Sequence, residues 1–242
     1  MSIYYIPGAS AASFKVAVLN SKGGCGKSMI ASNLACWYGI AGFDTAIIDF
    51  DPQGSALRWL AQRRSRTPTI HGVNGGHRQK TVTRSWQMRL PRETERVVID
   101  TPAGVRGFEL TDLIGQCDVI VIPVLPSDAD IHAGASFIAD LLLDARIRSA
   151  GTRVVVVANR VKANTRIYAS LQRFLDRLEF PFVAQFSDIQ TYIQAAQQGL
   201  GICEMRPDAL VRREVAQWRQ LLASLEGDIA PMDEPRSPAA VG

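Results

Sequence analysis

The residues best suited to chemistry lie in the segment SKGGCGKS, residues 21–28, which directly follows an apolar run and directly precedes a helical pattern. Its three glycines let backbone N–H groups approach a phosphate closely, and the start of a helix adds the positive end of a dipole. Lys27 can supply a mobile charge to the β- and γ-phosphates, and the Ser28 hydroxyl suits a magnesium ion. The segment therefore predicts a nucleoside triphosphate site, with a ligand-free glycine-rich turn as the alternative. The predicted nucleotide contacts are Gly23, Gly24, Cys25, Gly26, Lys27, Ser28 and Met29.

Acidic residues end two further apolar runs. Asp49 and Asp51 stand two apart after the run at 45–48, and Asp100 ends the sequence RVVID. Open α/β sheets bind ligands at the carboxyl ends of their strands, so these acids should face the nucleotide. Asp49 and Asp51 could instead cap a helix or form a turn, and four apolar residues followed by Asp form a common string.

Strands and helices must alternate along the chain to position these residues. The apolar runs are nearly continuous in Val, Ile and Leu, as expected of parallel strands that are buried on both faces. They cover residues 14–19, 45–48, 97–99, 119–123, 154–158 and 182–186, and helical patterns cover 27–40, 130–146, 164–178, 189–198 and 208–225. We therefore predict the α/β class, with a mostly parallel twisted sheet and helices on both faces.

Length and composition limit the number of domains and the class of protein. The 242 residues are 47% hydrophobic and 21% charged, which suits one large domain with a sizeable core, predicted over residues 1–226. Residues 227–242 are rich in Pro, Ala and acid and are predicted to form a disordered tail. The four cysteines form no C-x-x-C pair, which argues against a disulfide framework or a metal cluster and favours a reducing cytoplasm.

The pattern K-G-G-x-G-K-[ST], residues 22–28, resembles the deviant Walker A loop of the ParA and MinD ATPases. The resemblance implies a P-loop NTPase fold, ATP and Mg²⁺ as ligands, and an ATP-dependent homodimer. In that family the extra lysine, Lys22 here, reaches across the dimer to the neighbour's phosphates. Met29 stands where the family has threonine, so only its backbone N–H remains for the α-phosphate.

The same resemblance implies roles for the remaining site residues. The segment DFDPQ is similar to the family's D-x-D-P-Q, whose second acid, Asp51 here, orients the attacking water. Lys22, Lys27 and Asp51 would then be the catalytic residues. Ser28, Asp49 and Asp100 would serve the magnesium ion, Asp100 through water. Asn159 and Arg160 stand where the family often recognises adenine with an asparagine amide, with a turn-forming asparagine as the alternative.

Basic residues are concentrated in two regions. Residues 61–96 hold nine Lys and Arg against two acids, and residues 151–220 hold ten against six. Binding to DNA without sequence preference needs only several such side chains along the phosphates, although a charge run is more often a solvated face. The family places DNA contacts in its C-terminal helices, so the candidates are Arg206, Arg212, Arg213 and Arg219. Arg63, Arg64 and Arg66 could instead meet a partner protein.

These features predict a small ParA-like ATPase in the cytoplasm, associated with the nucleoid and without stable membrane association. It would bind DNA as an ATP dimer, and an adaptor protein on a plasmid, a chromosome region or an assembly such as a carboxysome would stimulate hydrolysis. The alternative is a MinD-like membrane-surface ATPase that regulates cell division. An iron–sulfur carrier lacks suitably spaced cysteines, and a bacterial tyrosine kinase lacks a tyrosine cluster in the tail.

Overall fold

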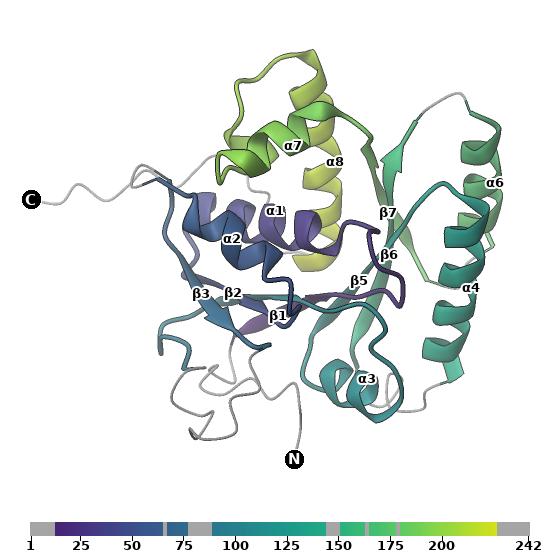
Figure 1. The fold of residues 1–242 in the computed structure, drawn as a ribbon, viewed down its shortest axis with the longest axis horizontal. Coiled ribbons are helices and arrows are strands. Elements are labelled where there is room, and N and C mark those ends of the chain that lie inside the picture. Colours follow the sequence, from purple (N-terminus) through teal and green to yellow (C-terminus); the bar gives the residue numbers. More distant parts are fainter. Residues whose placement is uncertain are drawn as a thin grey trace, which may run out of the picture.

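The computed structural model describes residues 13–64, 67–76, 89–143, 151–162, 165–177 and 180–226 (Figure 1). Seven strands among these residues form one sheet in the order β3-β2-β4-β1-β5-β6-β7, and every pairing between them is parallel. The strands are β1 (Phe14–Val18), β2 (Thr45–Asp49), β3 (Ile70–Asn74), β4 (Arg96–Asp100), β5 (Val119–Val124), β6 (Arg153–Val161) and β7 (Phe182–Ser187). The predicted α/β class and parallel sheet are confirmed.

Helices cover both faces of this sheet (Figure 1). One face carries α1 (Lys27–Ile40), α2 (Ser55–Ala61), α7 (Gln190–Gln197) and α8 (Ala209–Glu226), and the other carries α3 (Gly107–Ile114), α4 (Asp128–Leu143) and α6 (Arg166–Leu175). Side chains alternate along each strand, so Val16 and Val18 pack under the first layer while Ala17 and Leu19 pack under the second. Two apolar cores result, which explains why the strands contain few polar residues.

Among the strands and α-helices of the described residues, three were not predicted from the sequence. The edge strand β3 reads IHGVN, and only Ile70 and Val73 in it are buried. Helices α2 and α3 have seven and eight residues, too short for a periodic pattern to stand out. Predicted helix residues 144–146, 164 and 178 and the predicted tail at 227–242 lie outside the described residues.

The register of the strands gathers their carboxyl ends at one edge. Asp49 at the end of β2 pairs with Asp100 at the end of β4, and Val18 at the end of β1 pairs with the other side of Asp100. The loop that follows β1 is therefore held directly beside both acids.

The amino edge of the sheet holds the end of α8. The Arg96 guanidinium, at the start of β4, forms an ion pair of 2.9 Å with Glu226 and lies 3.9 Å from the ring centre of Phe43. Arg153, at the start of β6, donates hydrogen bonds to the carbonyl oxygens of Ser224 and Leu225. These contacts fix the last turn of α8 at the edge opposite the carboxyl ends.

No helix in the described part of the chain combines the length and the apolar character needed to cross a membrane.

Candidate nucleotide site

The glycine-rich loop between β1 and α1 is shaped for a phosphate. Gly24 and Gly26 have φ values of 78° and 94°, in the left-handed region that glycine adopts at little cost. A Cβ atom on Gly26 would lie 2.0 Å from the Asn159 amide nitrogen, so position 26 has no room for a side chain. No side chain caps the first turn of α1, and no acid lies there. Its free backbone N–H groups can therefore bind an anion.

Lys27 lies folded over this loop. Its side chain is buried, and its Nζ donates to the carbonyl oxygens of Lys22 at 3.0 Å and Asn20 at 3.4 Å. Cys25 beside it is also buried, and burial raises the pKa of its thiol. Lys27 thus brings a positive charge into the concave side of the loop, while Cys25 stays protonated and serves as a small packing residue.

Lys22 is held by an acid from the other sheet face. Its Nζ lies 2.8 Å from the Asp130 carboxylate, and its side chain keeps 38% of its surface exposed. Asp130, in the first turn of α4, is itself buried and accepts a hydrogen bond from the Ser127 hydroxyl. In this conformation Lys22 is paired within its own chain.

Asp49 caps α2. One carboxylate oxygen accepts from the backbone N–H groups of Ala56 and Leu57, at 3.0 and 3.1 Å, and the other accepts from that of Asp51 at 3.0 Å. The helix-capping alternative is therefore part of its role. Burial raises the pKa of Asp49, although these three donors lower it. Asp49 fixes the loop that carries Asp51 and leaves few lone pairs for a metal.

Asp51 is half-buried at the turn between β2 and α2. One carboxylate oxygen accepts from the backbone N–H of Gln53 at 2.9 Å, and its carbonyl oxygen accepts from Gly54 N at 2.8 Å. The second carboxylate oxygen has no hydrogen bond in the described part of the chain, so it is available to accept from a water molecule.

Asp100 is buried at the centre of the site. Neither carboxylate oxygen has a hydrogen-bond partner among the residues that the structure describes. Burial raises the pKa of Asp100 from 3.8 to about 7; the nearby Ser28 hydroxyl lowers it, and the charges of Asp49 and Asp51 raise it further. A buried carboxylate without donors is unfavourable unless a cation joins it.

A magnesium ion fits these residues. Mg²⁺ in nucleotide sites takes one or two protein oxygens and completes its shell with phosphate oxygens and water. Asp100 and Ser28 supply such oxygens beside the phosphate loop. No group of three or more His, Cys, Asp and Glu in the described ranges could hold a metal. Phosphate and water must therefore provide most of the ligands.

Asn159 braces the loop from the end of β6. Its amide nitrogen donates to the Cys25 carbonyl oxygen at 2.8 Å, and its amide oxygen accepts from Arg160 N at 2.9 Å. Its side chain is buried, and these two hydrogen bonds already use one amide N–H and one lone pair of the amide oxygen. Arg160 has φ 52°, and no other described residue except glycine has a positive φ. The predicted pair therefore sits at the loop, and its role with adenine stays a prediction.

A cavity of about 500 Å³ opens beside this brace. It is lined by residues of α2 and α7, by residues 187–189, and by Gly26, Met29, Asn159 and Arg160. The sequence prediction missed residues 187–189, although they follow the carboxyl end of β7 as the other site residues follow theirs. The rule that open α/β sheets bind ligands at the carboxyl ends of their strands would have predicted these residues.

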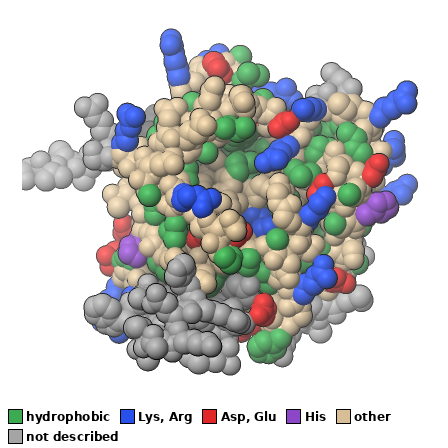
Figure 2. All heavy atoms as spheres, in the orientation of Figure 1, with side chains coloured by type: hydrophobic (Ala, Val, Ile, Leu, Met, Phe, Trp, Pro, Cys, Tyr) green, Lys and Arg blue, Asp and Glu red, His purple; other side chains and the backbone are tan. Residues whose placement is uncertain are grey.

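The four arginines predicted to bind DNA are all exposed. Arg212, Arg213 and Arg219 project from α8, whose opposite side buries Val211 and Trp218, and Arg206 precedes the helix. On the face drawn in Figure 2, Lys and Arg side chains are spread over the surface rather than gathered in one patch. These four arginines are therefore accessible to a ligand.

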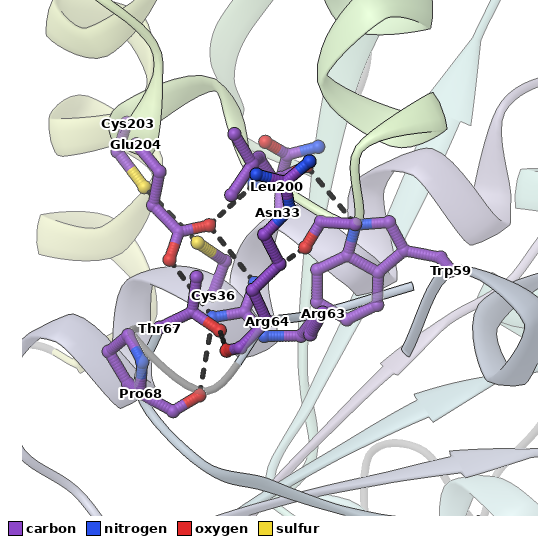
Figure 3. A network of polar contacts seen from close by, with 12 residues as sticks. Asn33, Cys36, Trp59, Arg63, Arg64, Thr67, Pro68, Leu200, Cys203 and Glu204 are labelled. Carbon is purple, nitrogen blue, oxygen red and sulfur yellow. Dashed lines mark hydrogen bonds and ion pairs between the residues drawn. The ribbon is translucent and has the colours of Figure 1, made fainter. Parts of the chain in front are cut away.

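Arg63, in the first basic region, is buried in an ion pair. Arg63 has only 5% of its side-chain surface exposed and pairs with Glu204 through two hydrogen bonds of 3.0 and 2.9 Å (Figure 3). It also donates to the carbonyl oxygens of Gly199 and Pro68 and lies over the Trp59 ring. The expectation that Arg63 meets a partner protein is therefore wrong, because its charge is used within the fold. Arg66 lies outside the described residues.

Comparisons with known proteins agree with this geometry. The family model described as the CobQ/CobB/MinD/ParA nucleotide binding domain matches residues 16–201. Maintenance of carboxysome distribution protein A from Halothiobacillus neapolitanus is 28% identical over 177 residues, covering 72% of this chain and 78% of the relative. The protein of the same name from Gloeobacter kilaueensis is 30% identical over 216 residues, covering 88% and 94%.

A solved structure shares the fold. The ATP complex of a Cyanothece McdA variant superposes with a TM-score of 0.61 at 17% identity, covering 88% of this chain and 97% of that one. The matched residues include the glycine-rich loop, Asp49, Asp100 and Asn159, which this structure brings to one edge of the sheet. The chain therefore belongs to the CobQ/CobB/MinD/ParA family of nucleotide-binding domains.

Proposed function

We propose that this chain is a magnesium-dependent ATPase that dimerises with ATP, binds DNA without sequence preference and positions an intracellular cargo. The proposal that the chain binds Mg²⁺ and ATP is supported above all by the Asp100 carboxylate, which lies beside Ser28 at the phosphate loop and has no hydrogen-bond partner among the described residues. The cargo part rests on the two relatives named for carboxysome distribution, one of which matches 88% of this chain.

In this proposal the loop holds the phosphates. The N–H groups of residues 23–29 and the Lys27 ammonium bind the phosphate oxygens, and Ser28 and Asp100 hold the magnesium ion. When bound, the ion neutralises charge that develops on the phosphates. Asp51 accepts a proton from the attacking water and orients it, and Asp49 acts by fixing the Asp51 turn. The products are ADP and phosphate.

The adenine base of the nucleotide would occupy the cavity beside Asn159 and Arg160. Asn159, which braces the loop, and residues 187–189 both line this cavity. A cavity of about 500 Å³ can hold the base and ribose. Adenine recognition would then come from the amide of Asn159, after it exchanges one of its present hydrogen bonds, and from backbone groups.

The dimer would depend on Lys22. Its half-exposed side chain can leave Asp130 and reach the phosphates of a second copy, where two charges on one γ-phosphate favour the ATP state over ADP. Each copy adds Arg206, Arg212, Arg213 and Arg219 to the DNA surface, so dimerisation doubles the number of phosphate contacts. Hydrolysis, stimulated by an adaptor protein on the cargo, would then release the chain from the nucleoid.

The test is DNA binding by the purified protein with ATP, with ADP and without nucleotide, at two salt concentrations and on DNA of unrelated sequence. We expect binding with ATP alone, weakened by salt, and no ATP-dependent binding by Lys22→Ala. Anionic vesicles form a parallel arm of the experiment. Binding to vesicles but not to DNA would replace the proposal by a MinD-like function at the membrane surface.

A further inference from the structure

Two cysteines far apart in the sequence lie in contact in the fold. The Sγ atoms of Cys36 in α1 and Cys203 in the short 3₁₀ helix η1 (Ile202–Glu204) are 3.4 Å apart, across a separation of 167 residues, and both thiols are free (Figure 3). Neither residue belongs to the nucleotide site described above.

The backbone holds the two thiols together. Asn33, one turn before Cys36, accepts a hydrogen bond of 2.7 Å from Ile202 N, which fixes η1 on α1. A Cβ atom on Gly201 would lie 2.5 Å from the Cys36 Sγ, so only glycine lets the segment come this close. The contact therefore follows from two tight packing features and does not depend on side-chain rotamers alone.

The distance is short enough for a covalent bond after small rotations. A disulfide has an S–S length of about 2.05 Å, so the two sulfur atoms must approach by roughly 1.4 Å. Both side chains can turn about χ1, and η1 needs only a small shift. Metal binding fits less well, because the described residues include no group of three His, Cys, Asp or Glu suited to a metal.

The surroundings give the two thiols different roles. Cys203 is partly exposed and can meet a small oxidant, whereas Cys36 is fully buried. Burial, the neighbouring Cys203 and the Glu204 carboxylate all raise the pKa of Cys36, which therefore remains a protonated thiol.

We propose that Cys36 and Cys203 form a reversible disulfide when the protein meets a peroxide. The Cys203 thiolate attacks hydrogen peroxide, its sulfur becomes a sulfenic acid, and the peroxide O–O bond breaks to leave hydroxide. The Cys36 sulfur then attacks the Cys203 sulfur, the S–O bond breaks, and the S–S bond forms as water leaves. Two thiols and one hydrogen peroxide thus give one disulfide and two water molecules, and an external dithiol reverses the change.

The bond would lock the connection between α7 and α8 onto α1. At present that connection is held to α1 and α2 by hydrogen bonds, the Arg63–Glu204 ion pair and packing. A covalent link across 167 residues of chain restricts the unfolded state, so the oxidised protein should unfold at higher temperature.

The test uses the full chain treated with a small excess of hydrogen peroxide, then quenched and denatured. We expect the free thiols to fall from four to two, and a non-reducing digest to contain one peptide pair linked through Cys36 and Cys203. Dithiothreitol should restore four thiols. The oxidised form should show a higher melting temperature than the reduced form.

Matched variants separate this bond from general oxidation. Cys117→Ala should still form the linked pair, whereas Cys203→Ser and Cys36→Ser should not form it or gain melting temperature on oxidation. Stepwise oxidation of Cys203 to sulfinic acid without a linked peptide would overturn the proposal. Links between two chains would also overturn it, and a linked pair that leaves the melting temperature unchanged would overturn the locking of η1 onto α1.

Discussion

Asp100 shows how one buried carboxylate can favour a bound cation. Its oxygens lack hydrogen-bond partners within the described residues, and its neighbours Asp49 and Asp51 add negative charge. Such a group weakens the free protein when it is ionised, and a bound cation removes that cost. The site therefore favours ligand binding at the expense of stability without ligand.

The pH dependence of stability tests this account of Asp100. Its pKa is raised from 3.8 to about 7, so between these values the folded state binds more protons than the unfolded state. The free energy of unfolding should fall as pH rises through this window. Asp100→Asn should lack this part of the fall, which chemical denaturation at several pH values without nucleotide can measure. Parallel curves for the two proteins would contradict the account.

A charge count could not show which basic residues reach solvent. Arg63 and Arg96 add to the positive charge of residues 61–96, yet both are buried in ion pairs with Glu204 and Glu226. Their partners are 141 and 130 residues away in the sequence, so no local pattern could reveal them. By contrast, the exposure of the arginines on α8 follows from helical periodicity, because the apolar residues define the opposite side.

At the scale of elements, Asp49 connects β2 to α2. Asp49→Ala would leave three backbone N–H groups without their acceptor; the buried one, at Ala56, costs about 1–3 kcal/mol, while the change relieves some repulsion on Asp100. The lost hydrogen bonds outweigh this relief, so we expect a net loss of about 2 kcal/mol. Urea unfolding measures it, with the exposed Asp140→Ala as the control. Unchanged stability would mean that α2 has no need of its cap.

The ion pair between Arg63 and Glu204 joins the end of α2 to η1. Arg63→Met leaves the Glu204 carboxylate largely buried without its partner, which costs about 3–5 kcal/mol. Combining it with Glu204→Gln removes the unpaired charge, so the double variant should be more stable than the sum of the single losses predicts. A double-mutant cycle by urea unfolding measures this, and strictly additive losses would show that the two side chains act independently.

Most elements could be predicted because buried parallel strands have a strong signal. Strands β2, β4 and β5 are buried along their whole length; β5 is apolar throughout, and β2 and β4 are apolar between their first and last residues. The cap on α2 could not be assigned from the sequence. Asp49 accepts hydrogen bonds from backbone N–H groups of α2 that come near it only when the turn between them folds. The hydrogen bond from Asn159 to Cys25 joins residues 134 apart in the sequence. The rule that ligands bind at the carboxyl ends of strands predicts where Asn159 lies, but it does not predict that Asn159 bonds to Cys25.

At the scale of the whole molecule, dimerisation should depend on whether Lys22 leaves Asp130. Lys22→Ala should still bind ATP but remain a monomer. Asp130→Asn weakens the ion pair of 2.8 Å and should let the ATP dimer form at lower protein concentration than in the unchanged protein. Analytical ultracentrifugation with a slowly hydrolysed ATP analogue measures both. A nucleotide-dependent dimer of Lys22→Ala would contradict the role of this lysine.

The proposed DNA surface can be tested with pairs of arginines on the two faces of the sheet. Arg212→Ala with Arg219→Ala should weaken DNA binding by the dimer and lower the steepness of its salt dependence by about four, because the two copies lose four phosphate contacts and each removes about 0.9 from the slope. Arg173→Ala with Arg177→Ala, which changes exposed arginines in and just after α6, should leave both unchanged. Equal effects of the two pairs would show that DNA binding reflects net charge alone.

The clamp on the last turn of α8 determines where a reporter group can be attached. Arg96 and Arg153 hold residues 224–226 at the amino edge of the sheet, whereas the phosphate loop, Asp51 and Asp100 lie at the carboxyl edge. A fluorescent protein joined after residue 226 would thus start at the opposite edge of the sheet from the nucleotide. Live imaging with such a fusion should report the distribution of the protein in the cell without altering the proposed ATP cycle.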